Sequence, residues 1–408
     1  HRNTIIISSK ITDQLIPLFD KLILVNNKKT IEVNWLFYLR VFLKYWISML
    51  HVVHVAISKY NPKRLVTIIF NNNSKIGIRI TEKNKIIGEI ITLYAESHEI
   101  KIHYEKLLDE DNNKLELLKT LFINWTSVQI FEILLFIYPL VNKNKTSILS
   151  PDKSYNMHKF LHEISGQIER SFVVYMEGGY RSIMIDIKNI ILGKAFNFLS
   201  LPVYSQNNLK FVDRLKEFSN YINMWLKKNK SLTIIYDVNI EKPLSNFISD
   251  GLFKGMVELH GKIASMHRLL DVVQPQYVFS QHSLGVNYAL GEFCAENIIP
   301  SLLIPHGSYV PHSDSIADLE WSGHAQTMIN SKFPFVALQT PWASKFLKDQ
   351  RSVLAQGVIT GPLVFGKKYN DINVDDGVKH RLYKGHKNKR IILHASSPRS
   401  WKSIRTWI

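Results

Sequence analysis

The 408-residue sequence contains one cysteine, Cys294, and this scarcity excludes several classes of protein. A single thiol forms no disulfide within the chain and cannot supply the several sulfur ligands of a structural zinc site. The 16 histidines show no HExxH or His-x-His spacing that would take their place. We therefore expect neither a bound metal nor a cofactor. Cys294 stands in an apolar stretch of a predicted helix, where an ordinary buried thiol is expected.

Several nucleotide-binding and nucleophile motifs are also missing. The sequence has no P-loop, no glycine fingerprint of a dinucleotide-binding turn and no Gly-x-Ser-x-Gly elbow. Gly178 and Gly179 lack a strand–turn–helix setting and predict a plain turn. The first 25 residues have polar interruptions and no small-residue cleavage site, so no secretory signal is visible in them. The sequence begins with His1 and ends at Ile408 soon after a predicted strand, so we expect a fragment of a longer protein.

Acidic residues are few relative to basic ones. The 34 Asp and Glu against 51 Lys and Arg give a formal net charge of +17. Such an excess attracts phosphates, nucleic acids and anionic membranes. The lysines, however, cluster with asparagine, as in residues 142–145 and 227–230, and lack the arginine and aromatic interleaving of a nucleic-acid surface. We expect no nucleic-acid partner.

Two long apolar segments raise the question of a membrane. Residues 34–57 carry Arg40 and Lys44 four apart on one helical face, and residues 121–141 contain Glu132. A charged side chain within a span costs a few kcal/mol, so we expect buried helices, or a helix lying on a membrane surface, rather than spans. The first segment is the better interfacial candidate. Its amphipathic anchors would be Trp35, Tyr38, Tyr45 and Trp46.

Residues 1–150 predict an α/β region that includes the possible membrane-surface helix. Short β-branched runs between polar turns predict strands at residues 4–7, 21–25, 65–70 and 86–94. Residues 104–141 predict a mostly helical segment. The polar stretch 142–156 predicts a loop or linker.

The pattern is sharper after residue 231, within a predicted Rossmann-like domain over residues 151–366 that continues the same lobe. Helices are predicted at residues 211–227, 246–270 and 286–297, and strands at residues 232–236, 277–280, 301–304 and 335–338. Thr340 is a predicted N-cap with Pro341 at the first helical position. Short apolar strands that alternate with helices predict an α/β fold with a doubly wound parallel sheet.

Polar loops follow three of these predicted strands. In an open α/β sheet, ligands bind beyond the carboxyl ends of the strands. Gln281 and His282 follow the strand at 277–280, His306 with Gly307 and Ser308 follows the strand at 301–304, and Gln339 follows the strand at 335–338. Histidine titrates near neutrality, so His306 and His282 are candidate bases that take a proton from a substrate hydroxyl. Structural histidines that bond neighbouring loops are the alternative.

The C-terminal part predicts the beginning of another domain. Residues 367–389 are rich in Lys, Asn, Asp and Gly and read as a linker. Residues 390–408 then give one buried strand and a loop, which predicts a second α/β domain that is mostly missing. Ser397 and Arg399 in this loop suit phosphate oxygens, although an N-cap with a surface arginine explains them equally well.

These segments together resemble bacterial cell-surface polysaccharide glycosyltransferases of the GT-B fold, of the capsule and O-antigen-like type. The resemblance covers about a third of the chain. It rests on QPQYVFSQHSLGVNYALGEFCAENIIPSLLIPHGSYVPH, FVALQTPWASKFL, VITGPLVFG and RIILHASSPRSW. The His-Gly pair after a strand is also similar to that of CDP-glycerol glycerophosphotransferases, which make teichoic acids.

The resemblance implies two Rossmann-like domains that face each other across a cleft. His306 would be the catalytic base, with His282 beside it. Gln281, Gly307 and Ser308 would line the acceptor side, and Ser397 and Arg399 would approach the donor diphosphate. The implied partners are a nucleotide-sugar donor, a polysaccharide or lipid-linked acceptor and an anionic membrane at its cytoplasmic face. No metal is implied, since helix dipoles and basic residues would steady the leaving diphosphate.

Three alternatives stay open. A CDP-activated polyol-phosphate transferase would use the same fold. A sugar-nucleotide epimerase is less favoured, because the sequence lacks the expected run of acidic residues and histidines. A non-enzymatic scaffold at a membrane or on nucleic acid is the third.

Overall fold

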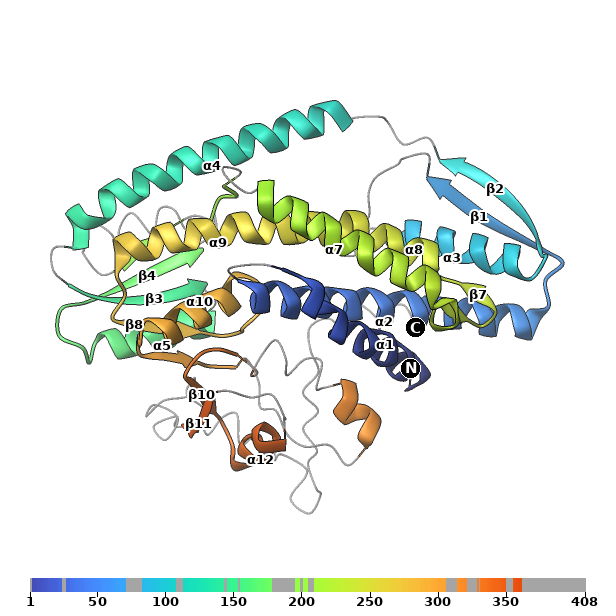
Figure 1. Cartoon of the computed structure of the whole chain (residues 1–408). Coiled ribbons are helices and arrows are strands. Elements are labelled where there is room, and N and C mark those ends of the chain that lie inside the picture. Colours follow the sequence, from blue (N-terminus) through green and yellow to red (C-terminus); the bar gives the residue numbers. More distant parts are fainter. Residues whose placement is uncertain are drawn as a thin grey trace, which may run out of the picture. The chain divides into compact units, whose positions relative to one another are not determined.

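A seven-stranded sheet organises the chain in the computed structural model (Figure 1). The structure describes residues 2–23, 27–70, 83–107, 113–142, 145–152, 155–177, 195–198, 201–204, 209–305, 314–320, 329, 331–349 and 355–361. The strands of this sheet are β3 (Thr146–Asp152), β4 (Ser171–Glu177), β5 (Ala195–Asn197), β8 (Tyr277–Ser280), β9 (Ser301–Leu303), β10 (Phe335–Leu338) and β11 (Gln356–Ile359). The fold class is therefore α/β, as predicted.

The strand order of this sheet is β11-β10-β9-β8-β3-β4-β5, and every neighbouring pair is parallel. Counted along the chain within this sheet, β3 is first, β8 is fourth and the order is 3-2-1-4-5-6-7. That order is compatible with a Rossmann-like fold. The direction of winding reverses between β3 and β8, so the topological switch point lies there.

Helices cover both faces of this sheet. α5 (Tyr155–Ser165) lies on one face, and α9 (Phe253–Val273), α10 (Val286–Glu296) and α12 (Pro341–Asp349) lie on the other. α7 (Leu209–Lys228) and the π-helical turn η4 (Phe247–Leu252) pack against α9, and α8 (Glu241–Asn246) packs against η4 and α7. Alternate strand residues point to opposite faces. Ile148 and Val173 pack with Leu161 of α5, whereas Leu149 and Val174 join the larger core that contains α9, α10 and α12.

The C-terminal half follows its predicted elements closely. Strands at 277–280, 301–304 and 335–338 and helices at 211–227, 246–270 and 286–297 are confirmed within a few residues. The Thr340 hydroxyl accepts a hydrogen bond from the Ala343 amide at 3.2 Å, which confirms the predicted cap of α12. Residues 232–236 differ. They give a 3-10 turn, η3 (Lys230–Leu232), and a small antiparallel hairpin of β6 (Ile234–Ile235) and β7 (Val238–Asn239) outside the main sheet.

The predicted linker at 142–156 is wrong. Residues 146–152 form β3, the strand at the switch point, which pairs with β4 on one side and β8 on the other. The serines that made this stretch look polar are buried, and Ser147 shares a hydrogen bond of 2.5 Å with the Tyr138 hydroxyl. A buried polar group that has a partner is tolerated in a core strand. β3 therefore crosses the predicted domain boundary at residue 150.

The N-terminal part is more helical than predicted. It contains α1 (Arg2–Leu15), the 3-10 helix η1 (Ile16–Lys21), α2 (Lys28–Tyr60), β1 (Arg64–Phe70), α3 (Lys83–Ser97), β2 (Lys101–Leu107) and α4 (Asn113–Asn142). β1 confirms the strand at 65–70 and pairs in parallel with β2. The predicted strand at 21–25 is absent at 21–23, and its remainder lies outside the described residues.

Two predicted strands of this part are helices instead. Residues 4–7 lie in α1 and residues 86–94 lie in α3. In the described side chains of α3 the large buried ones are Ile86, Ile90 and Tyr94, which recur every four positions as on one helical face. Burying each large side chain is worth about 1.5–3 kcal/mol. The preference of β-branched residues for strands spans only about 1 kcal/mol, so burial decides the conformation.

α2 is a core helix over its first half. Trp35 and Trp46 are fully buried, and Trp35 packs edge-on against Phe19. The predicted role of these two tryptophans as interfacial anchors is therefore wrong. Tyr38 and Tyr45 are partly buried and pack against the same core. By length and composition, α2 and residues 122–142 of α4 are both long and apolar enough to cross a membrane. Two such helices are weak evidence for a membrane span.

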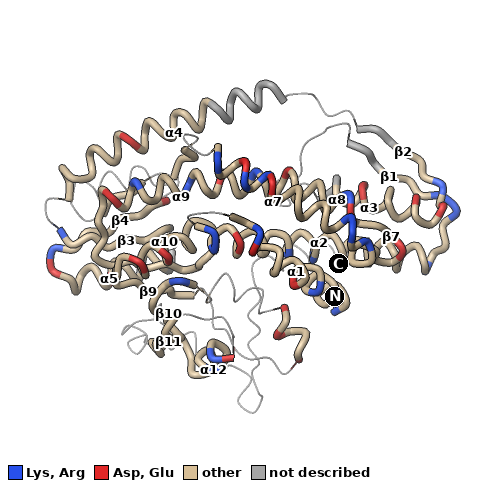
Figure 2. Tube along the Cα trace, in the orientation of Figure 1, with Lys and Arg blue, Asp and Glu red and all other residues tan. Residues whose placement is uncertain are grey.

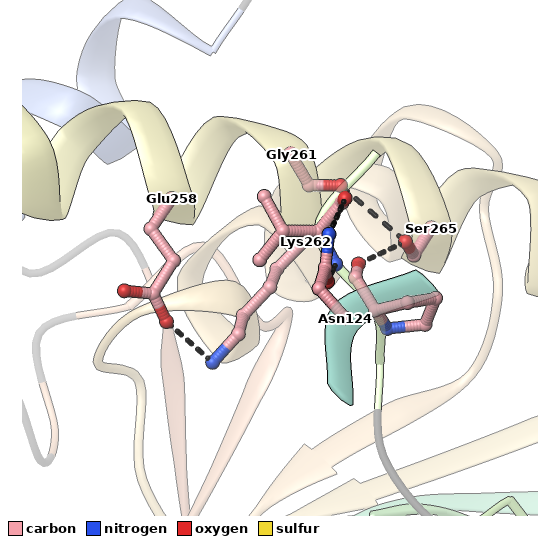
Figure 3. Close-up of polar contacts among 7 residues, drawn as sticks. Asn124, Glu258, Gly261, Lys262 and Ser265 are labelled. Atoms are coloured by element: carbon pink, nitrogen blue, oxygen red, sulfur yellow. Dashed lines mark hydrogen bonds and ion pairs between the residues drawn. The ribbon is translucent and has the colours of Figure 1, made fainter. Parts of the chain in front are cut away.

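The short segment 201–204 is clamped between α4 and α9 (Figure 3). The Asn124 side chain accepts from the Val203 amide and donates to the Val203 carbonyl, at 3.3 and 3.2 Å. On the other side, the Ser265 hydroxyl donates to the Pro202 carbonyl. Gly261 allows this approach, because a Cβ at this position would lie 2.6 Å from a Val203 methyl group.

Candidate functional site

The carboxyl ends of β3 and β8 define the candidate site. Leu149 of β3 is level with Val278 of β8 in the sheet register, so Ser150 and Ser280 lie just beyond this pair at the same edge. Both serines are fully buried. The chain leaves β3 toward α5 on one face and leaves β8 toward α10 on the other face. In sheets of this type the crevice between two such connections is where ligands bind.

His282 is held at this edge by its own loop. The Ser280 hydroxyl donates a hydrogen bond of 2.8 Å to the His282 carbonyl. The Asn287 amide, in the first turn of α10, lies 3.1 Å from Nδ1 of His282. The same amide nitrogen lies 3.4 Å from Nε2, so the contact holds the imidazole ring in place and leaves its tautomer open. Gln281 beside it is buried.

The N-terminal half of α2 braces the same loop from outside the sheet. Asn34 is fully buried, and its Oδ1 accepts a hydrogen bond of 2.7 Å from the Gly285 amide. Gly285 has φ of 66°, a left-handed conformation that favours glycine. One turn earlier, the Thr30 hydroxyl donates to Glu292 of α10 at 2.6 Å. Burial raises the pKa of Glu292, and the Thr30 hydrogen bond partly offsets this rise.

A hydrogen bond connects the loops that follow β9 and β10. The Gln339 side chain donates a hydrogen bond of 3.0 Å to the Pro305 carbonyl, immediately before His306. β8, β9 and β10 are neighbours in the sheet, so the three loops that the sequence singled out leave one continuous edge. His306, Gly307 and Ser308 lie outside the described residues, as do Ser397 and Arg399 and the whole segment 365–408.

A second histidine at this edge was missed by the sequence analysis. His158 is in the first turn of α5, directly after β3, and its Nδ1 lies 2.8 Å from the Tyr175 hydroxyl of β4. Tyr175 is buried and pairs in register with Ser150. The signal was present as a helix start that follows Ser-Ile-Leu-Ser at 147–150. It was hidden because this strand was taken for a linker.

The arrangement offers proton-transfer and hydrogen-bonding chemistry. Two imidazoles, a phenol and several hydroxyl and amide groups border the switch point. The described residues contain no group of three or more His, Cys, Asp or Glu that could hold a metal ion. Comparison with protein-family models, with curated proteins and with solved structures found no match.

Proposed function

We propose that this chain carries the acceptor-side domain of a glycosyltransferase of the GT-B fold. The enzyme would move a sugar from a nucleotide-sugar to a surface polysaccharide of the capsule or O-antigen-like type. The observation that carries the proposal is His282 at the switch point of a parallel sheet, in the segment that resembles such enzymes. The expected donor-binding residues, Ser397 and Arg399, belong to the second domain that the resemblance implies.

The proposed reaction requires a base at this edge of the sheet that removes one proton from the acceptor. The acceptor hydroxyl oxygen forms a bond to the anomeric carbon, and the bond from that carbon to the diphosphate oxygen breaks. A base takes the hydroxyl proton, which contributes about 10²–10⁴-fold to the rate. His306 and His282 are the candidates for this role.

The orientation of the Asn287 amide decides whether Nε2 of His282 can act as that base. If the amide donates to Nδ1, the ring proton is on Nε2 and that nitrogen is not a base. If the amide turns by 180°, its oxygen accepts from Nδ1–H, and Nε2 carries the lone pair. We therefore assign Asn287 as a positioning residue. Asn287→Asp keeps an acceptor for Nδ1–H and retains transfer, whereas Asn287→Leu loses it.

The alternative within enzymes is transfer of a polyol phosphate from a CDP-activated donor. The two proposals are distinguished by the donor. The gene product that contains this sequence is incubated with radiolabelled nucleotide-sugars and, in parallel, with CDP-[¹⁴C]glycerol, and label in polymer is counted. Incorporation of one sugar supports the glycosyltransferase. Incorporation of glycerol supports the alternative. If no nucleotide is consumed and none stabilises the fold against heat, a non-enzymatic scaffold replaces both.

We further propose that the enzyme sits peripherally on the cytoplasmic membrane face through α4. Five large side chains on one side of α4 are each more than half exposed and form what we call the α4 stripe: Phe122, Trp125, Ile133, Phe136 and Leu140. The part of α4 that is not grey in Figure 2 is tan apart from one red segment. The carboxylate of this part, Glu132, is bonded to Arg268 and Tyr204. An apolar face on a chain of net charge +17 suits an anionic bilayer.

Vesicle sedimentation tests this contact. Ile133→Ser with Phe136→Ser should abolish binding to phosphatidylglycerol-containing vesicles. The matched control is Val52→Ser with Val55→Ser, two exposed positions on the second half of α2, and it should bind as the unmodified chain does. If only the Val52→Ser, Val55→Ser variant lost binding, the membrane contact would lie on α2 instead of α4. A stripe that binds a protein partner instead would leave vesicle binding unchanged in both variants.

A further inference from the structure

A cavity of about 390 Å³ lies between α1, α2 and the helical segment 315–320. Its apolar wall consists of Ile5, Phe37, Val41 and Leu319. Small-molecule sites typically measure about 300–1,000 Å³ and combine apolar walls with a few placed polar groups. The volume and the lining of this cavity fit that description.

Two cations from one face of α2 line the cavity. Arg40 and Lys44 are four residues apart, so their side chains are neighbours on the helix. Glu320 is the third charged residue of the lining, which gives the described lining one net positive charge. Lys44 is ion-paired with Glu320, and Arg40 lies 3.6 Å from Asp13, which is outside the lining. Burial, partly opposed by Asp13, lowers the pKa of Arg40.

The Lys44–Glu320 ion pair can be exchanged at little cost. The two side chains are 33% and 24% exposed, and ion pairs that water reaches contribute about 0–1 kcal/mol. An incoming anion can therefore replace the Glu320 carboxylate at the Lys44 ammonium group. Arg40, one turn away, supplies a planar fork that matches carboxylate or phosphate oxygens.

We propose that this cavity binds a single-chain anionic amphiphile. Its apolar chain would pack against Ile5, Phe37, Val41 and Leu319, and its carboxylate or phosphate head would contact Arg40 and Lys44. The proposal rests on these three helices and is independent of the transferase proposal. It is also separate from the α4 stripe, which contributes no residue to the lining.

The test uses isothermal titration of the 408-residue chain with decyl phosphate, decanoate, decanol and inorganic phosphate, below the micelle concentration. Decyl phosphate or decanoate should bind at least tenfold more tightly than decanol, and inorganic phosphate more weakly still. The stronger of the two anionic probes identifies the head group. Equal affinity for decyl phosphate and inorganic phosphate would overturn the proposal of an amphiphile, because the decyl chain of the probe would then contribute nothing to binding.

Three variants locate the binding. Glu320→Gln removes the competing carboxylate and should tighten binding of the anionic probe several-fold, while Lys44→Gln should weaken it about tenfold. Val41→Trp fills the cavity and should abolish binding of every probe. Val41 is 41% exposed, and circular dichroism checks that the variant folds. The proposal is overturned if no probe binds, if a folded Val41→Trp variant still binds, or if affinity is indifferent to Glu320 and Lys44.

Discussion

At the scale of single residues, Gly261 shows how closely α9 approaches the segment 201–204. A Cβ at this position would lie 2.6 Å from the Val203 side chain and 3.0 Å from the Tyr204 carbonyl oxygen. We expect Gly261→Ala to destabilise the fold by about 1–2 kcal/mol, because overpacking outweighs the gain of about 1 kcal/mol in helix propensity. Urea unfolding measures the change. Val203→Ala in the same chain should recover part of the loss, and a stabilised Gly261→Ala variant would refute this packing.

Cys294 gives a second prediction at this scale. The thiol is fully buried in α10, and burial raises its pKa to about 12. A thiol with this pKa has little thiolate at neutral pH and should not react. Ellman's reagent should detect no thiol in the folded chain at pH 8 and one thiol per chain in guanidinium. Rapid reaction of the folded chain would contradict the packing of α10.

At the scale of elements, α4 is joined to α9 by a charged contact as well as by the Asn124 clamp. Arg268 of α9 donates to Glu132 at 2.6 Å, and Tyr204 donates to the same carboxylate. Burial alone would raise the pKa of Glu132, but the hydrogen bonds from Arg268 and Tyr204 outweigh it and lower the pKa below 4.5. The carboxylate therefore stabilises the fold when it is ionised.

This contact predicts a pH dependence with a definite sign. A carboxyl group with a depressed pKa contributes stability above pH 4.5, and the contribution is lost as the pH falls through the lowered pKa. Glu132→Gln should cost about 1 kcal/mol at pH 7, since partial exposure screens the pair. The difference between the two chains in urea unfolding should shrink below pH 4.5. A difference that is independent of pH would show that the charge of Glu132 contributes nothing.

At the scale of the whole molecule, the sequence predicted the second half of the sheet much better than the first. β8, β9 and β10 are each a short apolar run that ends at a polar loop, and they lie where this pattern predicted them. The prediction failed at β3 because the serines of this strand make the sequence look like a linker. These serines are buried, and their hydrogen-bond partners, such as Tyr138 for Ser147, lie on other elements of the fold. The strand order, and with it the switch point, depends on contacts between residues far apart in the chain.

Only part of the candidate site could be predicted, again because some of its contacts join residues far apart in the chain. His282 could be named from its place after a predicted strand. Asn34 and His158 could not, because the first acts from α2 and the second follows the strand that was missed. His306 remains a prediction, since it lies outside the described residues.

The central claim is that His282 at the switch point takes part in sugar transfer. The most direct test is the transfer rate of the gene product with its preferred nucleotide-sugar at saturation, compared with His282→Ala. His260→Ala is the matched control, because His260 lies on α9 and stacks on Phe211. We expect kcat to fall about 10²–10⁴-fold in the His282 variant, with donor binding retained, and to change less than twofold in the control. Equal rates in the His282 variant and the unmodified protein would contradict the account.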